Sequence, residues 1–192
     1  WGFQAQPNPH LDGRALSMSM GKGLGGGSSV NVMVWAHGHR SDWDHYADES
    51  GDSGWGADAV QAIYRRIENW QGAPDPQHRG TGGPVWVQPA ADPSPIAGAM
   101  LDAAQELGIP RFESPNGLMM AGEGGAAYTD MLVRDGRRHS LYRAYLRPWS
   151  DRPNLTIMTN TLVHRILFEG RRACSVEIER AGDIRLMGPA VK

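Results

Sequence analysis

A glycine-rich turn near the start of the chain is the first segment whose residue types could do chemistry. It runs over residues 21–29 as GKGLGGGSS and leads into an apolar run from Val30 to His37. Glycine has no Cβ, so backbone amides in such a turn can approach a phosphate closely. Lys22 is followed by glycine rather than Ser or Thr, which excludes a P-loop. A flexible linker is the plainer alternative, although a linker would not lead straight into an apolar element.

Histidines and carboxylates follow directly and could hold a metal ion. The set consists of His37, His39, Asp42, Asp44 and His45. H-x-H with nearby carboxylates is a ligand arrangement of metal-dependent hydrolases, and that activity is one alternative function. The spacing is loose, and short stretches of this composition often only face solvent. We therefore expect no metal site.

Other polar and aromatic residues receive structural interpretations. Arg137, Arg138 and His139 could hold an anion, but a solvated turn is the favoured reading. Cys174 is expected to be a small buried residue. The tryptophans at positions 35, 43, 55, 70 and 86 are expected in the core, with Trp35 a candidate to border a substrate cavity. A non-enzymatic binding module that uses the tryptophans is a further alternative function.

Helices and strands must position the glycine turn. Apolar spacing predicts a helix over 58–70 capped by Asp58, another over 94–107 begun by Ser94 and Pro95, and a short one over 140–147. Residues 1–20 read as irregular, and a helix is favoured after the glycine turn because Ser28, Ser29 and Asn31 suit a helix start. Predicted strands cover 85–87, 128–134 with a turn at Asp135-Gly136, 155–159, 162–168, 173–179 and 184–187.

The glycine turn and its surroundings resemble a known family. Residues 21–38, together with Asp44, are similar to the first signature of the glucose–methanol–choline (GMC) oxidoreductases. Four further segments resemble the middle region of that family, in the same order: DGRRHS at 135–140, AYLRP at 144–148, RPNL at 152–155 and VHRI at 163–166. The resemblance spans nearly the whole chain and is far more specific than a glycine motif alone.

The resemblance implies a fold and an activity. The expected fold class is α/β or α+β: a partial FAD-binding domain with a β-meander, plus part of a cap or substrate domain. The expected division is a FAD-contacting segment at 1–72, part of the cap or substrate region at 73–154, and the meander at 155–192. The implied activity is oxidation of a primary alcohol, choline-like or other, to an aldehyde by hydride transfer to FAD.

The resemblance also implies which residues meet the cofactor. Val30 stands where some family members carry a histidine linked to the flavin, so non-covalent FAD is implied. Ser19 and Met20 replace a usual Pro-Arg pair, and His37 replaces a frequent arginine. The turn residues expected to pack on FAD are Gly23, Gly25, Gly26, Ser28 and Ser29. The residues expected beside the isoalloxazine ring and pyrophosphate are Asn31, Val32, Met33 and Val34, and the backbone of Val163 is expected to meet the adenine.

Two parts of the family's machinery are expected outside this chain. The G-x-G-x-x-G motif that binds the ADP half of FAD would lie upstream, and the catalytic histidine would lie downstream. No catalytic residue is therefore assigned, and the chain is interpreted as an internal fragment that is inactive alone.

Composition limits the partners. The chain has 192 residues and a net charge of −2, which favours neither nucleic acid nor an anionic membrane. It has a single cysteine, no apolar run of membrane-spanning length and no signal peptide at its start, so a cytoplasmic location is expected. The expected partners are a small-molecule alcohol and an electron acceptor whose nature stays open, as does the choice between oxidase and dehydrogenase.

Overall fold

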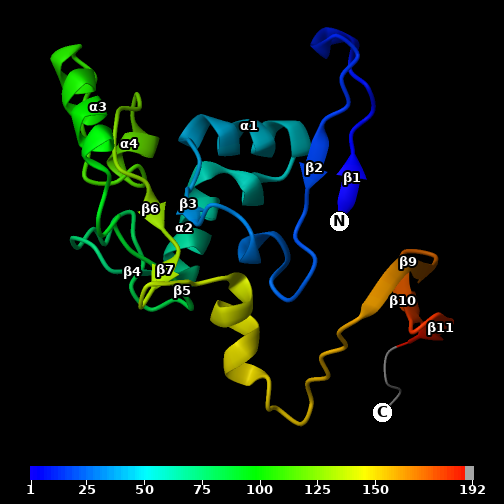
Figure 1. Cartoon of the computed structure of the whole chain (residues 1–192). Coiled ribbons are helices and arrows are strands. Elements are labelled where there is room, and N and C mark those ends of the chain that lie inside the picture. The colour runs from blue at the N-terminus through cyan, green and yellow to red at the C-terminus, as the bar shows by residue number, and fades with distance from the viewer. Residues whose placement is uncertain (189–192) are drawn as a thin grey trace. The chain divides into compact units, whose positions relative to one another are not determined.

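The computed structural model describes residues 1–188 of the chain (Figure 1). The chain divides into two compact units, Trp1–Trp149 and Ser150–Lys192, and each is described by itself. Helices and short strands are mixed in the first unit, and the second is built from strands. The expected mixed α and β class is therefore confirmed. The predicted borders at residues 72 and 154 stay predictions, and residues 189–192 of the expected meander segment lie outside the described residues.

Short strand pairs and four α-helices build the first unit. The helices are α1 (Arg40–Ser50), α2 (Ala57–Ile67), α3 (Pro95–Glu106) and α4 (Leu118–Ala121). The strands are β1 (Gly2–Gln4), β2 (Ser17–Ser19), β3 (Val34–Trp35), β4 (Glu68–Trp70), β5 (Val85–Val87), β6 (Asp130–Met131), β7 (Val133–Arg134) and β8 (Arg137–Arg138). Of the pairs, β1–β2, β3–β6 and β7–β8 are antiparallel, and β4–β5 is parallel.

The helix predicted over residues 58–70 is shorter than its apolar pattern indicates. It begins at Ala57, after Gly56 rather than Asp58 as N-cap, and the Ala57 N–H donates to Asp44 Oδ1 at 3.0 Å. It ends at Ile67, and β4 follows at once. Pairing with β5 overrides the helical pattern here, because it buries the side chains of Glu68 and Trp70.

The helix favoured after the glycine turn is wrong. Residues Gly26–Ser29 form one turn of 3-10 helix, η2, and the chain then extends into β3, which pairs with β6. Met33 has a φ of 62°, in the left-handed region that an α-helix cannot contain. Of the apolar run, only Val34–Trp35 forms a strand, and only Met33 and Trp35 pack against the core.

The ends of the first unit also differ from the prediction. The expected irregular lead-in contains the β1–β2 hairpin, whose register pairs Phe3 with Met18. The short helix predicted over 140–147 is present as a π-helix, η4 (Tyr142–Leu146), followed by one 3-10 turn, η5 (Arg147–Trp149). The predicted turn at Asp135-Gly136 is confirmed, and both residues adopt the positive φ that a tight hairpin favours.

A small core holds the first unit together. It consists of Trp70, Val85, Val87, Leu132 and Ala144, with Met33 and Trp35 packed against it. Of the five tryptophans expected in the core, Trp70 is buried, Trp55 is half exposed, and the others are intermediate. In α3, Leu101 is buried, whereas Ile96 and Met100 are exposed, as is Leu107 at the C-cap.

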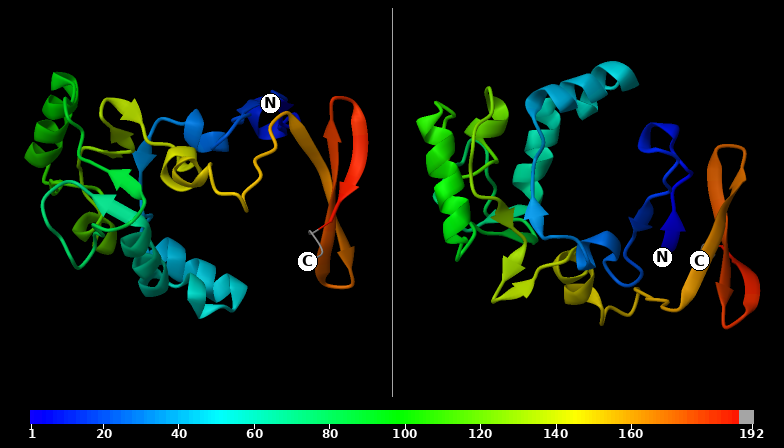
Figure 2. Two further views of the ribbon diagram at one scale, coloured as in Figure 1. Left: turned by 90° about the horizontal axis from the view of Figure 1, so that it is seen from below. Right: turned by 45° about the horizontal axis from the view of Figure 1, so that its top comes forward.

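The second unit is the predicted meander. Its strands are β9 (Thr161–Glu169), β10 (Arg172–Arg180) and β11 (Asp183–Met187), joined in the antiparallel order β11–β10–β9. Both views of Figure 2 show them as one twisted ribbon, coloured orange to red. Ile178 is buried in it and Cys174 only half-buried. The strand predicted over 155–159 is absent, because that segment pairs with no other strand among the described residues.

Within residues 1–188, no helix combines the length and the apolar character needed to cross a bilayer.

Candidate functional site

Steric constraint and local hydrogen bonds define the glycine turn. Gly25 has a φ of 86° and Gly26 a φ of 52°, both in the region that glycine adopts without strain. A Cβ at Gly21 would overlap the backbone of Gly26. The hydroxyls of Ser28 and Ser29 donate back to the carbonyls of Gly25 and Leu24, at 2.6 and 2.7 Å. The turn is therefore a defined, tightly wound structure, and the flexible-linker alternative is wrong.

The segment after the turn exposes apolar side chains. Val30 is 61% and Val32 is 77% exposed, and Val34 is exposed as well. Met33, in contrast, packs against the core cluster. Soluble proteins rarely leave neighbouring apolar side chains uncovered unless the surface meets another group. This strip beside the glycine turn can accept a flat apolar ring.

Residues near the C-terminal end of the first unit form hydrogen bonds with the glycine turn and the segment after it. Asn31 Oδ1 accepts hydrogen bonds from the Met33 N–H at 3.0 Å and from Arg138 Nη1 at 2.7 Å. Leu141 donates its N–H to Ser28 Oγ at 3.0 Å. Arg138 follows the β7–β8 turn and Leu141 directly precedes the π-helix, so more than a hundred residues of sequence separate the two sides of this contact.

The structure places nine of the ten residues implied to contact FAD in one continuous segment. Val163 is the exception: it lies on β9 of the second unit, opposite Ile178, and is 53% exposed. The nine are Gly23, Gly25, Gly26, Ser28, Ser29, Asn31, Val32, Met33 and Val34, which span the turn, η2 and the start of β3.

The histidines and carboxylates after the turn do not converge. His39 accepts from the Ser41 N–H as the cap of α1, and Asp44 accepts from the start of α2. His37 is 2% exposed and stacks on Tyr64, with ring centroids 4.3 Å apart. Throughout residues 1–188, no group of three or more His, Cys, Asp or Glu side chains is arranged to hold a metal ion. Nothing in the geometry favours the hydrolase alternative.

A buried ionic cluster joins β4, β6 and the loop between β4 and β5. Arg79 is 4% exposed; its Nη2 lies 2.6 Å from Glu68 Oε1 and its Nη1 2.9 Å from Asp130 Oδ2. The arginine also stacks on Trp70, 3.5 Å from the ring centroid. Asn116 Nδ2 donates to Asp130 Oδ2 at 2.8 Å. Each buried charge therefore has an opposite charge and further hydrogen bonds, as buried ions require.

The environment of Glu68 favours its ionised form. Burial by itself raises the pKa of this carboxyl group. The nearby His37 and the hydrogen bonds and charge of Arg79 outweigh burial, so the pKa of Glu68 falls to about 2. The His37 Nε2 lies 3.4 Å from Glu68 Oε1, a long contact, whereas Arg79 approaches both carboxylate oxygens within 3.0 Å. Arg79 is therefore the dominant partner.

Sequence reasoning missed this cluster. Asp130 has no partner that spacing could reveal, because Arg79 is 51 residues away. Glu68 falls within the predicted helix, where a carboxylate normally faces solvent. The solvated turn predicted for Arg137, Arg138 and His139 is also only partly solvated, since His139 is buried and Arg138 half-buried. Only a three-dimensional arrangement identifies these partners.

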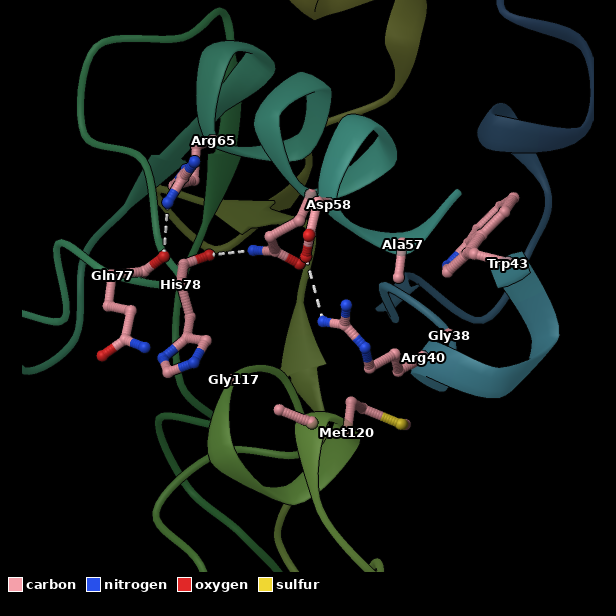
Figure 3. A pocket seen from close by; sticks show the side chains of 12 residues that line it. Gly38, Arg40, Trp43, Ala57, Asp58, Arg65, Gln77, His78, Gly117 and Met120 are labelled. Atoms are coloured by element: carbon pink, nitrogen blue, oxygen red, sulfur yellow. Dashed lines mark hydrogen bonds and ion pairs between the residues drawn. The ribbon is translucent and has the colours of Figure 1, made fainter. Parts of the chain in front are cut away.

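A pocket of about 310 Å³ with mixed polar and apolar lining lies between α1, α2 and α4. Figure 3 shows its side chains converging from these helices and from the loop that carries Gln77 and His78. Arg40 pairs with Asp58 at 3.0 Å, and Arg65 donates to the Gln77 carbonyl at 2.6 Å. Both arginines of the pocket therefore have partners within the protein, and a structural role accounts for them without a ligand.

Trp35 borders a second, apolar pocket of about 620 Å³. Aromatic residues from several elements line it, among them Trp43, Trp55, Tyr64 and Tyr145. Its walls come from β3, α1, α2, β5 and the π-helix, so residues far apart in the sequence form it.

Comparison with known proteins gives consistent matches. Residues 7–188 match the GMC oxidoreductase family. The oxygen-dependent choline dehydrogenase of Brucella anthropi is 40% identical over 179 residues, which are 93% of this chain and 32% of that protein. Pyridoxine 4-oxidase from Mesorbium loti has 32% identity and a TM-score of 0.88, with 98% of this chain and 36% of that one covered. An FAD-dependent oxidoreductase from Chaetomium thermophilum has 25% identity and a TM-score of 0.86, with 99% and 35% covered.

The chain spans about a third of the length of the curated relatives that it matches. The family match nevertheless extends over both structural units, from before the glycine turn to the end of the described meander. The protein is therefore a member of the GMC oxidoreductase family.

Proposed function

We propose that the protein containing this chain is an FAD-dependent oxidoreductase that converts a small primary alcohol to an aldehyde. The observation that carries the proposal is the glycine turn of residues 21–29 with the exposed apolar strip directly after it. Bound FAD would accept hydride from the carbinol carbon, while a base outside this chain takes the hydroxyl proton.

The residues present fit such a cofactor. Gly23, Gly25 and Gly26 leave the turn without side chains, so backbone can approach the cofactor closely. Val32 and Val34 offer apolar contact, and Ser28 and Asn31 are already oriented by hydrogen bonds. This chain's part in the reaction is to bind and orient the flavin, with Val163 of the second unit as the proposed contact for the adenine.

The attachment of the cofactor is proposed to be non-covalent. Val30 occupies the position where a histidine links the flavin in some members of the family, and an alkyl side chain cannot form that bond. Val30 is 61% exposed, which supports contact with the flavin rather than a role in the core.

The proposed substrate is a choline-like alcohol. Its support is the name of the B. anthropi relative, an oxygen-dependent choline dehydrogenase. The electron acceptor is left open. A cytoplasmic location is proposed from the single cysteine and the composition.

The test is to purify the whole protein that contains this chain and to treat it with acid. FAD released into the supernatant in about equimolar amount, together with choline-dependent flavin reduction without oxygen, is the expected result. A protein that carries no flavin, or that holds zinc at equimolar level, would contradict the proposal. Flavin that stays in the precipitate would refute non-covalent attachment alone.

A further inference from the structure

Arginine side chains surround a pocket beside the β7–β8 hairpin. It has a volume of about 460 Å³, within the range of small-molecule sites. One carboxylate, Asp135, and one imidazole, His139, share the lining. The arginines are Arg134, Arg137, Arg138, Arg143 and Arg147.

Most of these positive charges are not neutralised by carboxylates. Asp135 is 90% exposed and lies 3.8 Å from Arg134, a weak contact in water. Arg134 also lies over the Trp86 ring, 4.6 Å from its centroid. Arg137 and Arg143 have no ion pair with any acidic side chain among residues 1–188. Guanidinium groups gathered in one hollow repel one another, and an anion would relieve that repulsion.

The pocket has a rigid wall. His139 is 7% exposed and its Nε2 lies 3.2 Å from the Pro84 carbonyl, which holds the imidazole in place. Arg138 is held by Asn31 Oδ1 at 2.7 Å and by the Ser28 carbonyl at 3.4 Å. The hairpin turn fixes the backbone between Arg134 and Arg137. The arginines are thus presented by ordered elements rather than by a loose tail.

We propose that this arginine pocket binds an oxyanion of the phosphate class, held chiefly by Arg137 and Arg143. Guanidinium groups match phosphate oxygens with paired hydrogen bonds, and neither Arg137 nor Arg143 is paired with Asp135, the one carboxylate in the lining. The pocket is larger than one phosphate group requires, so a diphosphate or a phosphorylated small molecule is the favoured ligand. The site is separate from the proposed flavin contacts, because none of those ten residues lines it.

Contact between Arg138 and Asn31 connects the pocket to the segment proposed for the flavin. An anion that attracts Arg138 would compete with the Asn31 side-chain oxygen for the same guanidinium. Binding in the pocket is therefore expected to alter the flavin environment without displacing the flavin. This consequence rests on the proposed function, whereas anion binding itself does not.

The experiment is calorimetric titration of inorganic pyrophosphate into the whole purified protein, at low salt and with sodium chloride of matched ionic strength as reference. The test variant is R137Q/R143Q, with R137Q alone as a milder form if the double variant folds poorly. The matched control is R185Q, on the exposed side of β11 in the second unit. Flavin content is measured by visible absorbance on the same samples.

Saturable binding that weakens about tenfold or more in R137Q/R143Q and at least severalfold in R137Q, but stays unchanged in R185Q, is the expected result. Heat no larger than that of chloride, or equal affinity in the arginine variants and the control, would overturn the proposal. Release of flavin by pyrophosphate would overturn the claim of a separate site. A protein without flavin that still binds pyrophosphate in the expected pattern would contradict the proposed function and support the anion site.

Discussion

Gly25 is constrained in two independent ways at the scale of a single residue. Its φ of 86° lies in the left-handed region, and a Cβ there would meet the Ser29 and Ser28 hydroxyls and the Cβ of Tyr142. Gly27, two positions on, has open space around its missing Cβ and no positive φ. Two neighbouring glycines of one motif thus have different reasons to be glycine.

Replacing Gly25 by Ala is expected to destabilise the turn. The left-handed conformation alone costs about 1–2 kcal/mol for a residue with a Cβ, and the overlap with Ser29 adds to this. The measurement is thermal unfolding together with flavin content after purification, and both are expected to fall. Gly27→Ala is the matched control and should leave the unfolding midpoint nearly unchanged. Equal effects of the two substitutions would show that the turn differs from the arrangement described.

At the scale of elements, the buried ionic cluster links the β4–β5 strand pair to the β3–β6 strand pair. Glu68 belongs to β4, Asp130 to β6 and Arg79 to the loop between β4 and β5. Trp35 of β3 also donates its indole N–H to Glu68 Oε1 at 2.9 Å. Besides its pairing with β6, the strand that follows the glycine turn is therefore bound to the buried Glu68 carboxylate, whose ionised form the cluster stabilises.

The ionisation of Glu68 gives a pH dependence with a definite sign. Because its pKa is depressed from 4.5 to about 2 in the folded state, its stabilising contribution is complete above pH 4.5 and is lost as the pH falls toward 2. A difference of this size corresponds to about 3 kcal/mol at neutral pH. Urea unfolding of Glu68→Gln should show a free energy of unfolding lower by that order at pH 7. The fall of this free energy at acidic pH, the acid limb of its pH profile, should be flatter than in the parent protein.

Glu49→Gln is the control for that experiment, because Glu49 is exposed on α1. It should leave both the stability at pH 7 and the acid limb close to those of the parent protein. An acid limb in Glu68→Gln as steep as in the parent would mean that Arg79 does not hold Glu68 in its ionised form.

At the scale of the whole molecule, much apolar surface is uncovered. Ile96 and Met100 on α3 and Leu107 at its C-cap are each more than 60% exposed, and so are Ile184 and Leu186 on β11. Monomeric soluble proteins rarely expose contiguous apolar patches of large area. The chain also spans only about a third of its curated relatives, so further chain in such proteins is available to cover these faces.

The 192-residue chain expressed by itself is accordingly expected to bind a hydrophobic dye under native conditions and to self-associate. The measurements are dye fluorescence and light scattering, compared with the full-length protein at equal concentration. Strong dye binding by the short chain and weak binding by the full-length protein is the expected pattern. A monodisperse short chain without dye binding would show that its apolar faces need no further cover.

Local sequence patterns were sufficient for much of this fold. The β9–β11 meander, α3 with Ser94 and Pro95 at its start, and the Asp135-Gly136 turn follow from alternation, capping and turn chemistry, all of which act over a few residues. The glycine turn was recognised in the same way, and with it the family. These features depend on neighbours in sequence, so one chain is enough to predict them.

Tertiary contacts decided the rest. The end of α2 became β4 because a parallel partner was available at β5, and the segment after the glycine turn became a strand because β6 pairs with it. Arg79 and Asp130, and likewise Asn31 and Arg138, are partners across 51 and 107 residues. Long-range pairing and charge burial depend on which surfaces meet in space. The sequence by itself therefore determined the family and the local elements, whereas the tertiary structure decided the strand partners, the ionic cluster and the arginine pocket.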